Sequence, residues 1–470
     1  MEQNLKIVLA DPPHIHSEWM IANHPNLGVL YLISYLRQHV AEVELHYLEA
    51  RLDLAGHLRK LEQIQPSLYG LSFSVMREKD ALLTIKAVRN RFPRLPIICG
   101  GPYPTVVPEH VLTSSPSDVC VLGEGEVTLA EVVTAYQMGT SLDAIPGIVF
   151  RQNGVLRRTA PRELVRDVDS LPFPAWDLID FSQYKGAYQF LARPNTSIIT
   201  SRGCPFDCVF CANAVWKFSK PWLRLRSPGN VCDEISWLYQ LGIREISIRS
   251  DEFNPVLSWP LDFCREIQKR GLEGLYLQGN LRADNLTDEL ARAMKRSNFW
   301  LVQLGIESGN QRTLDGIRKR LTLEQIRSAC QVLKTNGIRV YGYVMIYHAW
   351  EEQGRVCYET PEDVDRTLAF LRELKKQHLL DYMSFSTATP IIGSELYEIA
   401  QRHQLLKRED GVDDLAAFSM QLPGISEKEM KRSRRKGLLL QLSLNMGSGH
   451  NNFTDWSKNW HKVKTLVRSI

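Results

Sequence analysis

The chain has 470 residues, of which 44% are hydrophobic and 23% charged, and its formal net charge is +4. These values are typical of globular proteins, and a chain of this length has room for two or three domains that each bury a core. The small charge gives no general case for binding nucleic acid or membranes, and no apolar run approaches the roughly 18–20 residues that span a bilayer. Nine cysteines and no secretory signal at the start predict free thiols in a reducing cytoplasm.

Residues 1–137 are predicted to form an N-terminal domain in which strands and helices alternate. Strand patterns occur at 6–10, 43–48, 68–74, 96–99 and 119–122, with helix patterns at 27–38, 54–64, 80–91 and 126–136. This alternation predicts an α/β fold with a doubly wound, Rossmann-like parallel sheet, whose ligand crevice lies at the carboxyl ends of the strands. The loops at those ends contain Pro13, Ser72, Gly100, Gly101, Gly123 and Glu124.

Two further regions follow before the C-terminal end. Residues 138–194 are predicted to be a connector, because prolines at 172 and 174 favour extended backbone. Residues 195–394 contain strand patterns at 196–200, 245–249, 275–278, 300–305, 339–346 and 383–388, with helical stretches between them. Six such units predict a partial parallel barrel with its active groups at the carboxyl ends of the strands. Residues 395–470 are predicted to form a helical C-terminal extension.

Three cysteines directly follow the first barrel strand: Cys204, Cys208 and Cys211, in the pattern Cys-x3-Cys-x2-Cys. Thiolates at this spacing can bind three corners of one iron–sulfur cube, and one iron stays open because no fourth cysteine lies between Cys211 and Cys232. The alternative is a structural zinc site, which usually takes four protein ligands in paired sets, and no second pair follows. The pattern therefore predicts a [4Fe–4S] cluster that acts on a bound small molecule.

This cysteine pattern, with the aromatic Phe210 before its last cysteine, resembles the signature of the radical S-adenosylmethionine (SAM) superfamily. The resemblance implies that SAM chelates the open iron and is cleaved by an electron into methionine and a 5′-deoxyadenosyl radical. That radical abstracts hydrogen from a substrate, while the protein positions and shields the cofactors. The resemblance also implies an external one-electron reductant such as flavodoxin or ferredoxin.

Other motifs at the carboxyl ends of the barrel strands match the same superfamily. Gly305-Ile306-Glu307-Ser308-Gly309 is nearly the standard family sequence. Through the resemblance, the residues that contact SAM are expected to be Phe210, Asp251, Glu252, Arg282, Glu307, Ser308 and Gly393. A strand-end turn with solvated acids is the alternative for Asp251 and Glu252, and an ion pair with Asp284 is the alternative for Arg282.

The sequence departs most from the family after the strand at 339–346, where relatives continue into a Gly-x-Pro-Gly-Glu loop. Tyr347, His348 and Trp350 occupy this region, and Glu359-Thr360-Pro361-Glu362-Asp363 then resumes the familiar pattern. Tyr347 and His348 are candidates for shaping a substrate pocket or for moving protons in catalysis. The alternative is a repacked loop without a chemical role.

The order of strands and loops in residues 1–137 resembles the cobalamin-binding domain of one large radical SAM subfamily. Through this resemblance, the strand-end residues from Pro13 to Glu124 named above would contact cobalamin. The Asp-x-His-x-x-Gly motif, whose histidine ligates cobalt in many cobalamin proteins, is missing here, as it is in many members of the subfamily. Its absence neither proves nor excludes cobalamin.

The resemblance favours a cobalamin-dependent methyltransferase that acts on an unactivated carbon or phosphorus centre of a small-molecule or natural-product substrate. The main alternative is a cobalamin-independent radical SAM enzyme that performs dehydration, cyclisation or rearrangement and retains an empty domain. A SAM-binding protein with a non-reactive cluster is another alternative. Enzymes that thiomethylate tRNA are less well matched, because they normally carry a second cysteine set and an RNA-binding module, neither of which is evident.

Overall fold

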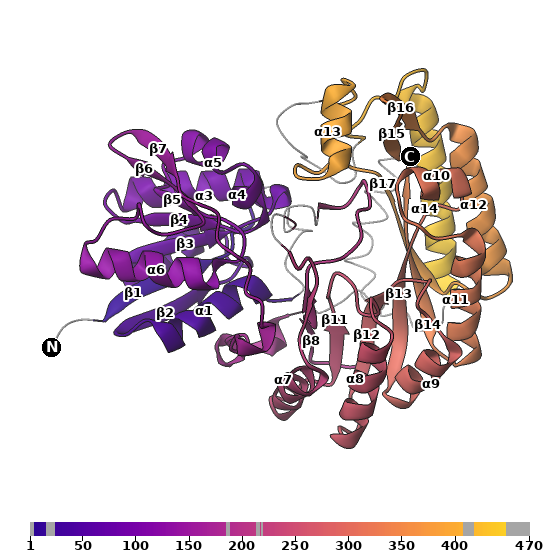
Figure 1. Cartoon of the computed structure of the whole chain (residues 1–470), viewed down its shortest axis with the longest axis horizontal. Coiled ribbons are helices and arrows are strands. Elements are labelled where there is room, and N and C mark those ends of the chain that lie inside the picture. Colours follow the sequence, from indigo (N-terminus) through magenta and orange to yellow (C-terminus); the bar gives the residue numbers. More distant parts are fainter. Residues whose placement is uncertain are drawn as a thin grey trace. The chain divides into compact units, whose positions relative to one another are not determined.

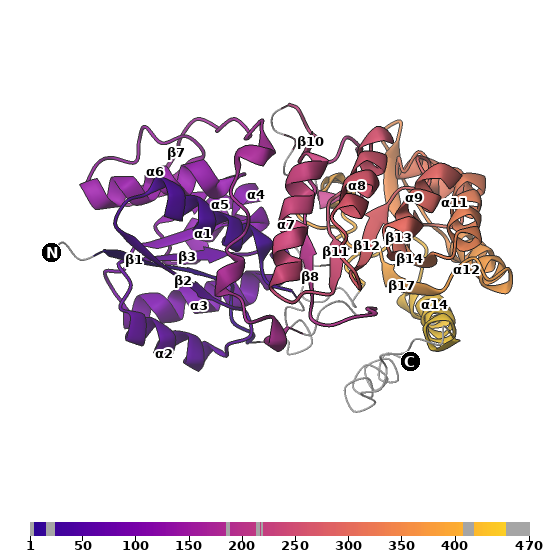
Figure 2. The same ribbon diagram turned by 90° about the horizontal axis from the view of Figure 1, so that it is seen from below.

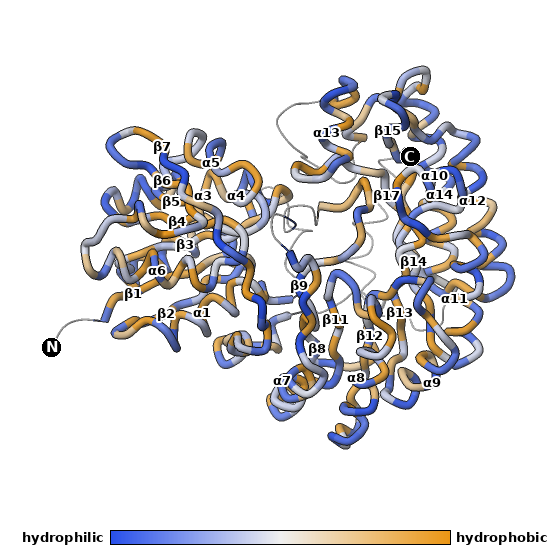
Figure 3. The backbone as a smooth tube through the Cα atoms, in the orientation of Figure 1, coloured by the Kyte–Doolittle hydropathy of each residue, from blue (hydrophilic) through white to orange (hydrophobic). Residues whose placement is uncertain are grey.

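The computed structural model describes residues 4–15, 24–184, 189–212, 217, 220–407 and 418–447. The chain divides into two compact units, Met1–Lys185 with Val215–Pro221, and Gly186–Ala214 with Trp222–Ile470. Each unit is an α/β structure built around its own sheet (Figure 1). Figure 3 shows hydrophobic residues along the strands of both sheets and hydrophilic residues on the outer turns of helices such as α8 and α9.

The first unit contains a seven-stranded sheet in the order β2-β1-β3-β4-β5-β6-β7. Its parallel strands confirm the five predicted from sequence: β1 (Leu5–Ala10), β2 (Val43–Leu48), β3 (Leu68–Ser72), β4 (Ile97–Gly100) and β5 (Val119–Val121). The connecting helices are α1 (Leu27–His39), α2 (Leu54–Ile64), α3 (Glu78–Arg91), α4 (Pro102–Val106), α5 (Pro108–Ser114) and α6 (Gly125–Met138). Helices α1 and α6 pack together on one face of the sheet, and α2 and α3 lie on the other (Figure 2).

The strand order places a topological switch between β1 and β3. Leu9 of β1 pairs with Tyr47 of β2 on one side and with Gly70 of β3 on the other. Helices that leave the sheet in opposite directions open a crevice at the carboxyl ends of these strands. The sheet is therefore doubly wound, as the alternating sequence pattern predicts, and the predicted crevice lies at its switch point.

The region predicted as a connector contributes two strands to this sheet. β6 (Ile148–Gln152) and β7 (Val155–Arg158) form an antiparallel hairpin, and β6 also pairs antiparallel with β5. Asn153 and Gly154 form the turn, both with positive φ, of 51° and 81°. An Asn-Gly pair favours such two-residue hairpins because both residues tolerate the left-handed backbone. The connector's remaining described elements are the short 3-10 turns η3 (Val168–Ser170), η4 (Trp176–Leu178) and η5 (Phe181–Gln183).

The second unit contains a six-stranded parallel sheet in the order β17-β14-β13-β12-β11-β8, as predicted for a partial barrel. Its strands are β8 (Asn195–Ile198), β11 (Glu245–Ile248), β12 (Tyr276–Leu281), β13 (Phe299–Glu307), β14 (Arg339–Ile346) and β17 (Tyr382–Thr387). The helices of this repeat are α7 (Pro228–Gln240), α8 (Ser258–Lys269), α9 (Asp288–Arg296), α10 (Gln311–Gly316), α11 (Leu323–Thr335) and α12 (Pro361–Lys376). Figure 2 shows these helices along the outer side of the strands.

Smaller elements complete the second unit. The strands β9 (Ser201–Arg202) and β10 (Arg224–Leu225) pair on either side of the cysteine loop, and β15 (Ala349–Glu352) forms a hairpin with β16 (Arg355–Tyr358). The predicted helical extension contains α13 (Glu395–Arg402) and α14 (Glu427–Gly447), and its residues 408–417 and 448–470 lie outside the described part of the chain. Among the described helices, none is both long enough and apolar enough to cross a membrane.

Helix α14 covers the edge of the barrel sheet. The Asn445 side chain accepts a hydrogen bond from the backbone N–H of Met383 at 3.0 Å and donates one to its carbonyl at 3.2 Å. The Gln441 side chain accepts a bond from the N–H of Phe385 at 3.0 Å. Because a bare strand edge leaves its backbone groups unpaired, these amides take the place of a further strand.

Candidate functional site

The cysteine loop begins where β8 ends. Gly203 precedes the first cysteine with φ of +79°, and a Cβ atom at this position would overlap the Trp222 carbonyl, so only glycine fits the turn. The loop is then anchored to the segment after α10: the N–H of Val209 donates to the Ile317 carbonyl at 3.0 Å, and the Cys208 Sγ contacts the Arg318 carbonyl at 3.8 Å. The loop conformation therefore depends on residues more than one hundred positions away.

The three thiols of this loop have the chemistry of cluster ligands. Cys204, Cys208 and Cys211 are half-buried, and none of them is in a disulfide. Burial raises the pKa of Cys204 to about 12 and also raises that of Cys208. Among the residues that the structure describes, no three His, Cys, Asp or Glu side chains converge on a single metal ion. A cube does not need such convergence, because it takes one thiolate on each of three irons.

A buried ion pair lies beside the cysteine loop. The Lys319 Nζ donates to the Glu307 Oε1 at 2.8 Å, and both side chains are at most 10% exposed. Burial acts to lower the pKa of Lys319, but the negative charges of Glu307 and Cys208 together outweigh this effect, so the pKa of the ammonium lies above its ordinary value. A Cβ atom at position 305 would collide with both charged groups, so Gly305 leaves the space that the pair occupies.

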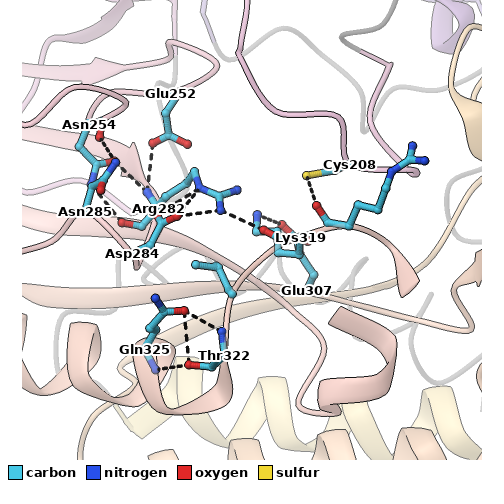
Figure 4. A network of polar contacts seen from close by, with 12 residues as sticks. Cys208, Glu252, Asn254, Arg282, Asp284, Asn285, Glu307, Lys319, Thr322 and Gln325 are labelled. Carbon is cyan, nitrogen blue, oxygen red and sulfur yellow. Dashed lines mark hydrogen bonds and ion pairs between the residues drawn. The ribbon is translucent and has the colours of Figure 1, made fainter. Parts of the chain in front are cut away.

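Arg282 and Glu252 form a second polar group next to the Glu307–Lys319 pair (Figure 4). The Arg282 guanidinium bonds Asp284 and the Lys319 carbonyl, and it stacks on the Phe206 ring at 3.6 Å from the centroid. The Glu252 carboxylate accepts the Arg282 backbone N–H at 3.0 Å. Burial raises the pKa of Glu252 to about 7, against the opposing charges of Lys319 and Arg282. The predicted Arg282–Asp284 ion pair is therefore present, and the same arginine also contacts the cysteine loop.

Ser308 and Glu359 connect the ends of β13 and β14 to helix α12. The Ser308 hydroxyl donates to the Glu359 carboxylate at 2.9 Å and lies 2.9 Å from the Thr367 hydroxyl. The Glu359 carboxylate also accepts the backbone N–H of His348 at 3.1 Å. Burial raises the pKa of Glu359 to about 7, although these hydrogen bonds oppose the shift. The Ser308 hydroxyl is thus occupied by contacts within the protein.

The structure separates the two catalytic candidates, Tyr347 and His348. The Tyr347 ring contacts Phe418, and its hydroxyl lies 3.5 Å from the Glu429 carbonyl at the start of α14. The His348 ring instead lies 5.6 Å from the Phe210 ring, centroid to centroid. His348 is fully buried, and among the described residues neither of its ring nitrogens has a hydrogen-bond partner. Burial lowers the pKa of its imidazole to about 3, although the Glu307 backbone opposes the shift.

The remaining SAM candidates lie in three places. Phe210 packs between the His348 ring and the Lys319 Nζ, which is 6.0 Å from its centroid. Asp251 is exposed in the segment that follows β11. Gly393 has φ of +91° in the turn before α13. In the sequence it lies far from the polar pairs described above. Lys319 was missed by sequence reasoning, because the run Arg318-Lys319-Arg320 looks like an ordinary exposed basic segment.

In the first unit, the strand-end candidates gather at one edge of the sheet. Ser72 pairs with Gly100 across β3 and β4, and a Cβ atom on Gly101 would lie 2.8 Å from the Ser72 Oγ. The Gly123 N–H donates to the Thr105 hydroxyl at 3.0 Å. The Pro13 carbonyl accepts from Arg77, and the Glu124 carboxylate accepts the Val165 N–H at 2.8 Å. Close backbone approach of this kind suits a large ligand at the carboxyl edge of the strands.

A buried carboxyl group lies at the same edge. The Asp11 carboxyl accepts hydrogen bonds from the Asn26 amide and the Tyr47 hydroxyl, each at 2.5 Å. Burial raises the pKa of Asp11 to about 6, even though both hydrogen bonds act to lower it. The local sequence around Asp11 carries no signal for its burial, because its partners Asn26 and Tyr47 lie on other elements.

Comparisons with known proteins agree with both halves of this description. Residues 198–356 match the family model of the radical SAM superfamily, and residues 22–133 match that of the B12-binding domain. The chain is 31% identical over 406 residues to an uncharacterized methyltransferase of Pyrococcus horikoshii, which covers 86% of this chain and 84% of that protein. It is 30% identical over 406 residues to the anaerobic magnesium-protoporphyrin IX monomethyl ester cyclase of Rubrivivax gelatinosus, covering 83% of this chain and 69% of the cyclase.

Among solved structures, the radical SAM methyltransferase TsrM of Kitasatospora setae, bound to tryptophan and a SAM analogue, has a TM-score of 0.68. It is 19% identical and covers 85% of this chain and 76% of TsrM. At this level of identity the likeness concerns the fold.

Proposed function

Because this chain belongs to the radical SAM superfamily and carries a B12-binding domain, we propose that it is a cobalamin-dependent methyltransferase. The proposed target is an unactivated carbon or phosphorus centre of a small-molecule substrate. The observation that carries the proposal is the presence of both a three-cysteine loop and a B12-type sheet in one chain. The likeness to the Pyrococcus methyltransferase over most of both chains supports it.

The cofactors of this enzyme are a [4Fe–4S] cluster, SAM and cobalamin. When bound, the cluster and SAM supply a hydrogen-abstracting radical, and cobalamin supplies the methyl group. We propose that Cys204, Cys208 and Cys211 each hold one iron, which the thiol chemistry of the loop supports. Since SAM cleavage consumes an electron, the proposal includes an external one-electron reductant such as flavodoxin or ferredoxin.

The charges around the cysteine loop support a role in binding SAM, whose methionyl end carries both an ammonium and a carboxylate. Glu252 and Asp251 offer acceptors to the ammonium group, and Lys319 with Arg282 offers positive charge to the carboxylate. Both cations are already paired, so their side chains are held in place before a ligand arrives. This preorganisation lowers the entropic cost of binding.

We propose that His348 positions Phe210 and does not transfer protons. A general base works best when its pKa lies near the working pH, and the pKa of this buried imidazole is about 3. Its ring contact instead supports the aromatic residue next to the last cysteine. The Tyr347 ring, directed at Phe418, is proposed to hold the C-terminal segment against the barrel.

The test uses anaerobically purified protein with a reconstituted cluster. After incubation with hydroxocobalamin and desalting, about one cobalamin per chain is expected to remain. With reduced flavodoxin as the electron source, SAM should then yield S-adenosylhomocysteine by loss of its methyl group and 5′-deoxyadenosine by reductive cleavage. A Cys204→Ser variant should lose 5′-deoxyadenosine formation. A matched Cys357→Ser variant, at a half-buried cysteine outside the loop, should keep it.

A second candidate function is a radical ring closure without methyl transfer, which the 30% identity to the Rubrivivax cyclase favours. The same experiment separates the two. Formation of 5′-deoxyadenosine without cobalamin-dependent S-adenosylhomocysteine would reject methyl transfer and favour the cyclisation reading.

A further inference from the structure

A row of polar side chains crosses the barrel sheet on the face opposite its helices. Successive residues of a strand point to opposite faces, and the apolar positions Ile248, Leu277 and Val302 are fully buried. The alternate positions are polar on three neighbouring strands, where Ser247 pairs with Gln278 and Asn280 pairs with Gln303. Polar residues in the interior of a parallel sheet are unusual, because the strands of such sheets are normally continuous hydrophobic runs.

Hydrogen bonds fix the orientation of this row. The Gln278 Nε2 donates to the Glu245 carboxylate at 2.7 Å, and the Gln303 Nε2 donates to the Gln278 Oε1 at 2.8 Å. The Gln303 Oε1 must therefore face the other way, where it accepts the Tyr343 hydroxyl at 2.9 Å. The chain of donors leads from a buried carboxylate at the start of β11 to the carboxyl end of the sheet.

Arg249 lies at the carboxyl end of the sheet, and none of the described carboxylates pairs with its charge. It directly follows β11, and its Nη1 contacts only neutral acceptors, the Gln303 Oε1 at 3.2 Å and the Tyr343 hydroxyl at 3.5 Å. Among the described residues, no carboxylate lies within ion-pair distance of this guanidinium. By contrast, the buried arginines Arg226 and Arg282 are each paired with a carboxylate.

Two buried polar atoms near Arg249 also have no partner within the described part of the chain. They are the Ser247 Oγ, two residues earlier on the same face, and the Asn280 Oδ1, on the neighbouring strand opposite Gln303. Leaving such a group unsatisfied in a protein interior is costly, so a partner supplied from outside the chain is expected. The Arg249 guanidinium, beside the Ser247 hydroxyl, which can also donate, matches the acceptor oxygens of an oxyanion. The Asn280 Oδ1 is an acceptor and suits an N–H or O–H donor of the same ligand.

We propose that Arg249, with the Ser247 hydroxyl, binds an anionic group of the substrate, a carboxylate or a phosphoryl or phosphonyl oxyanion. The inference rests on the proposed function, because it names the chemical class of substrate that the barrel takes. Arg249 is a binding residue in this scheme. Its side chain fixes one end of the substrate, while the chain from Glu245 to Gln303 holds the arginine in place.

The test measures anion binding by the reconstituted protein saturated with SAM, so that the SAM carboxylate already occupies its own position. Inorganic phosphate and acetate are titrated separately by calorimetry at low, constant ionic strength. Arg249→Gln removes the charge at similar size and should weaken binding by about tenfold or more, because charge-assisted hydrogen bonds are the strong ones. Arg249→Lys should retain more of the affinity. Arg292→Gln, which removes an exposed charge paired with Asp288, is the matched control and should bind as the wild type does.

The outcomes separate cleanly. Selective loss in Arg249→Gln supports the proposal, and the tighter of the two probes indicates a phosphoryl or a carboxylate substrate. Equal affinities in all variants, an equal loss in Arg292→Gln, or no anion binding by the wild type would each overturn it. A parallel loss of SAM affinity in Arg249→Gln would also overturn it, because the arginine would then serve SAM. Thermal unfolding of each variant shows that it is folded, and the 5′-deoxyadenosine assay tests the proposed function independently.

Discussion

Asn445→Ala tests how much the stability of the edge strand β17 depends on helix α14. The Asn445 amide, 9% exposed, satisfies both the N–H and the carbonyl of Met383, a residue that is fully buried on strand β17. The substitution leaves two buried backbone groups without partners. An unsatisfied buried group costs about 1–3 kcal/mol, so the local loss for two groups should be about 2–6 kcal/mol.

Hydrogen exchange measured by mass spectrometry over residues 382–387 is the appropriate assay, because it reports the opening of this strand and not the unfolding of the whole chain. A loss of about 2 kcal/mol corresponds to roughly thirtyfold faster exchange of the Met383 amide. Gln331→Ala, which removes only a 3.3 Å contact with Thr335 on the exposed face of α11, is the control and should leave this strand unchanged. Unaltered exchange in Asn445→Ala would refute the reasoning and show that the edge is protected in another way.

Two further predictions concern the two units separately. The folded-state pKa of Asp11, about 6, lies above its ordinary value of 3.8, so its contribution to stability is present below about pH 3.8 and is lost as the pH rises through about 6. Relative to Asp11→Asn, the wild type should therefore lose up to about 3 kcal/mol of unfolding free energy between about pH 4 and pH 7 in denaturant titrations, and parallel pH profiles would contradict this. Gly316→Ala should destabilise the barrel unit by about 1–3 kcal/mol, because its Cβ atom would overlap the buried Trp350 ring. Gly229→Ala, where the added methyl group meets open space, should be neutral or slightly stabilising in the same thermal unfolding assay.

The sequence pattern was sufficient for the parallel strands, because alternating segments such as 339–346, in which every second residue is buried, are typical of strands. It was not sufficient for the hairpin β6–β7, although Asn153-Gly154 carried a usable turn signal inside a region with proline punctuation. Proline and glycine there favoured a connector, and the short strands gain their stability from pairing with β5. Local propensity cannot reveal such pairing.

The candidate cysteine ligands were predictable from their spacing, but the charges around them were not. Lys319 becomes buried only because Gly305, far from it in sequence, leaves room beside Glu307. Arg249 lies in a strand-end segment where nothing in the local sequence shows that its charge lacks a carboxylate. That no carboxylate of the described residues pairs with it is a property of the folded sheet. The positions and partners of ionisable groups therefore required the structure, whereas their residue types did not.

The attachment of the cysteine loop to the segment after α10 has a consequence for the assembly of the enzyme. The loop is formed early in the chain, but the Ile317 and Arg318 carbonyls that hold it are made only after four barrel strands have been synthesised. The Leu396 N–H, at the start of α13, then donates to the Val209 carbonyl and closes the loop from the other side. A nascent chain that stops short of α13 therefore presents three cysteines without the shape that binds a cube. Iron loading should accordingly follow completion of the barrel. A chain that carries the cluster is then one whose six barrel strands have folded.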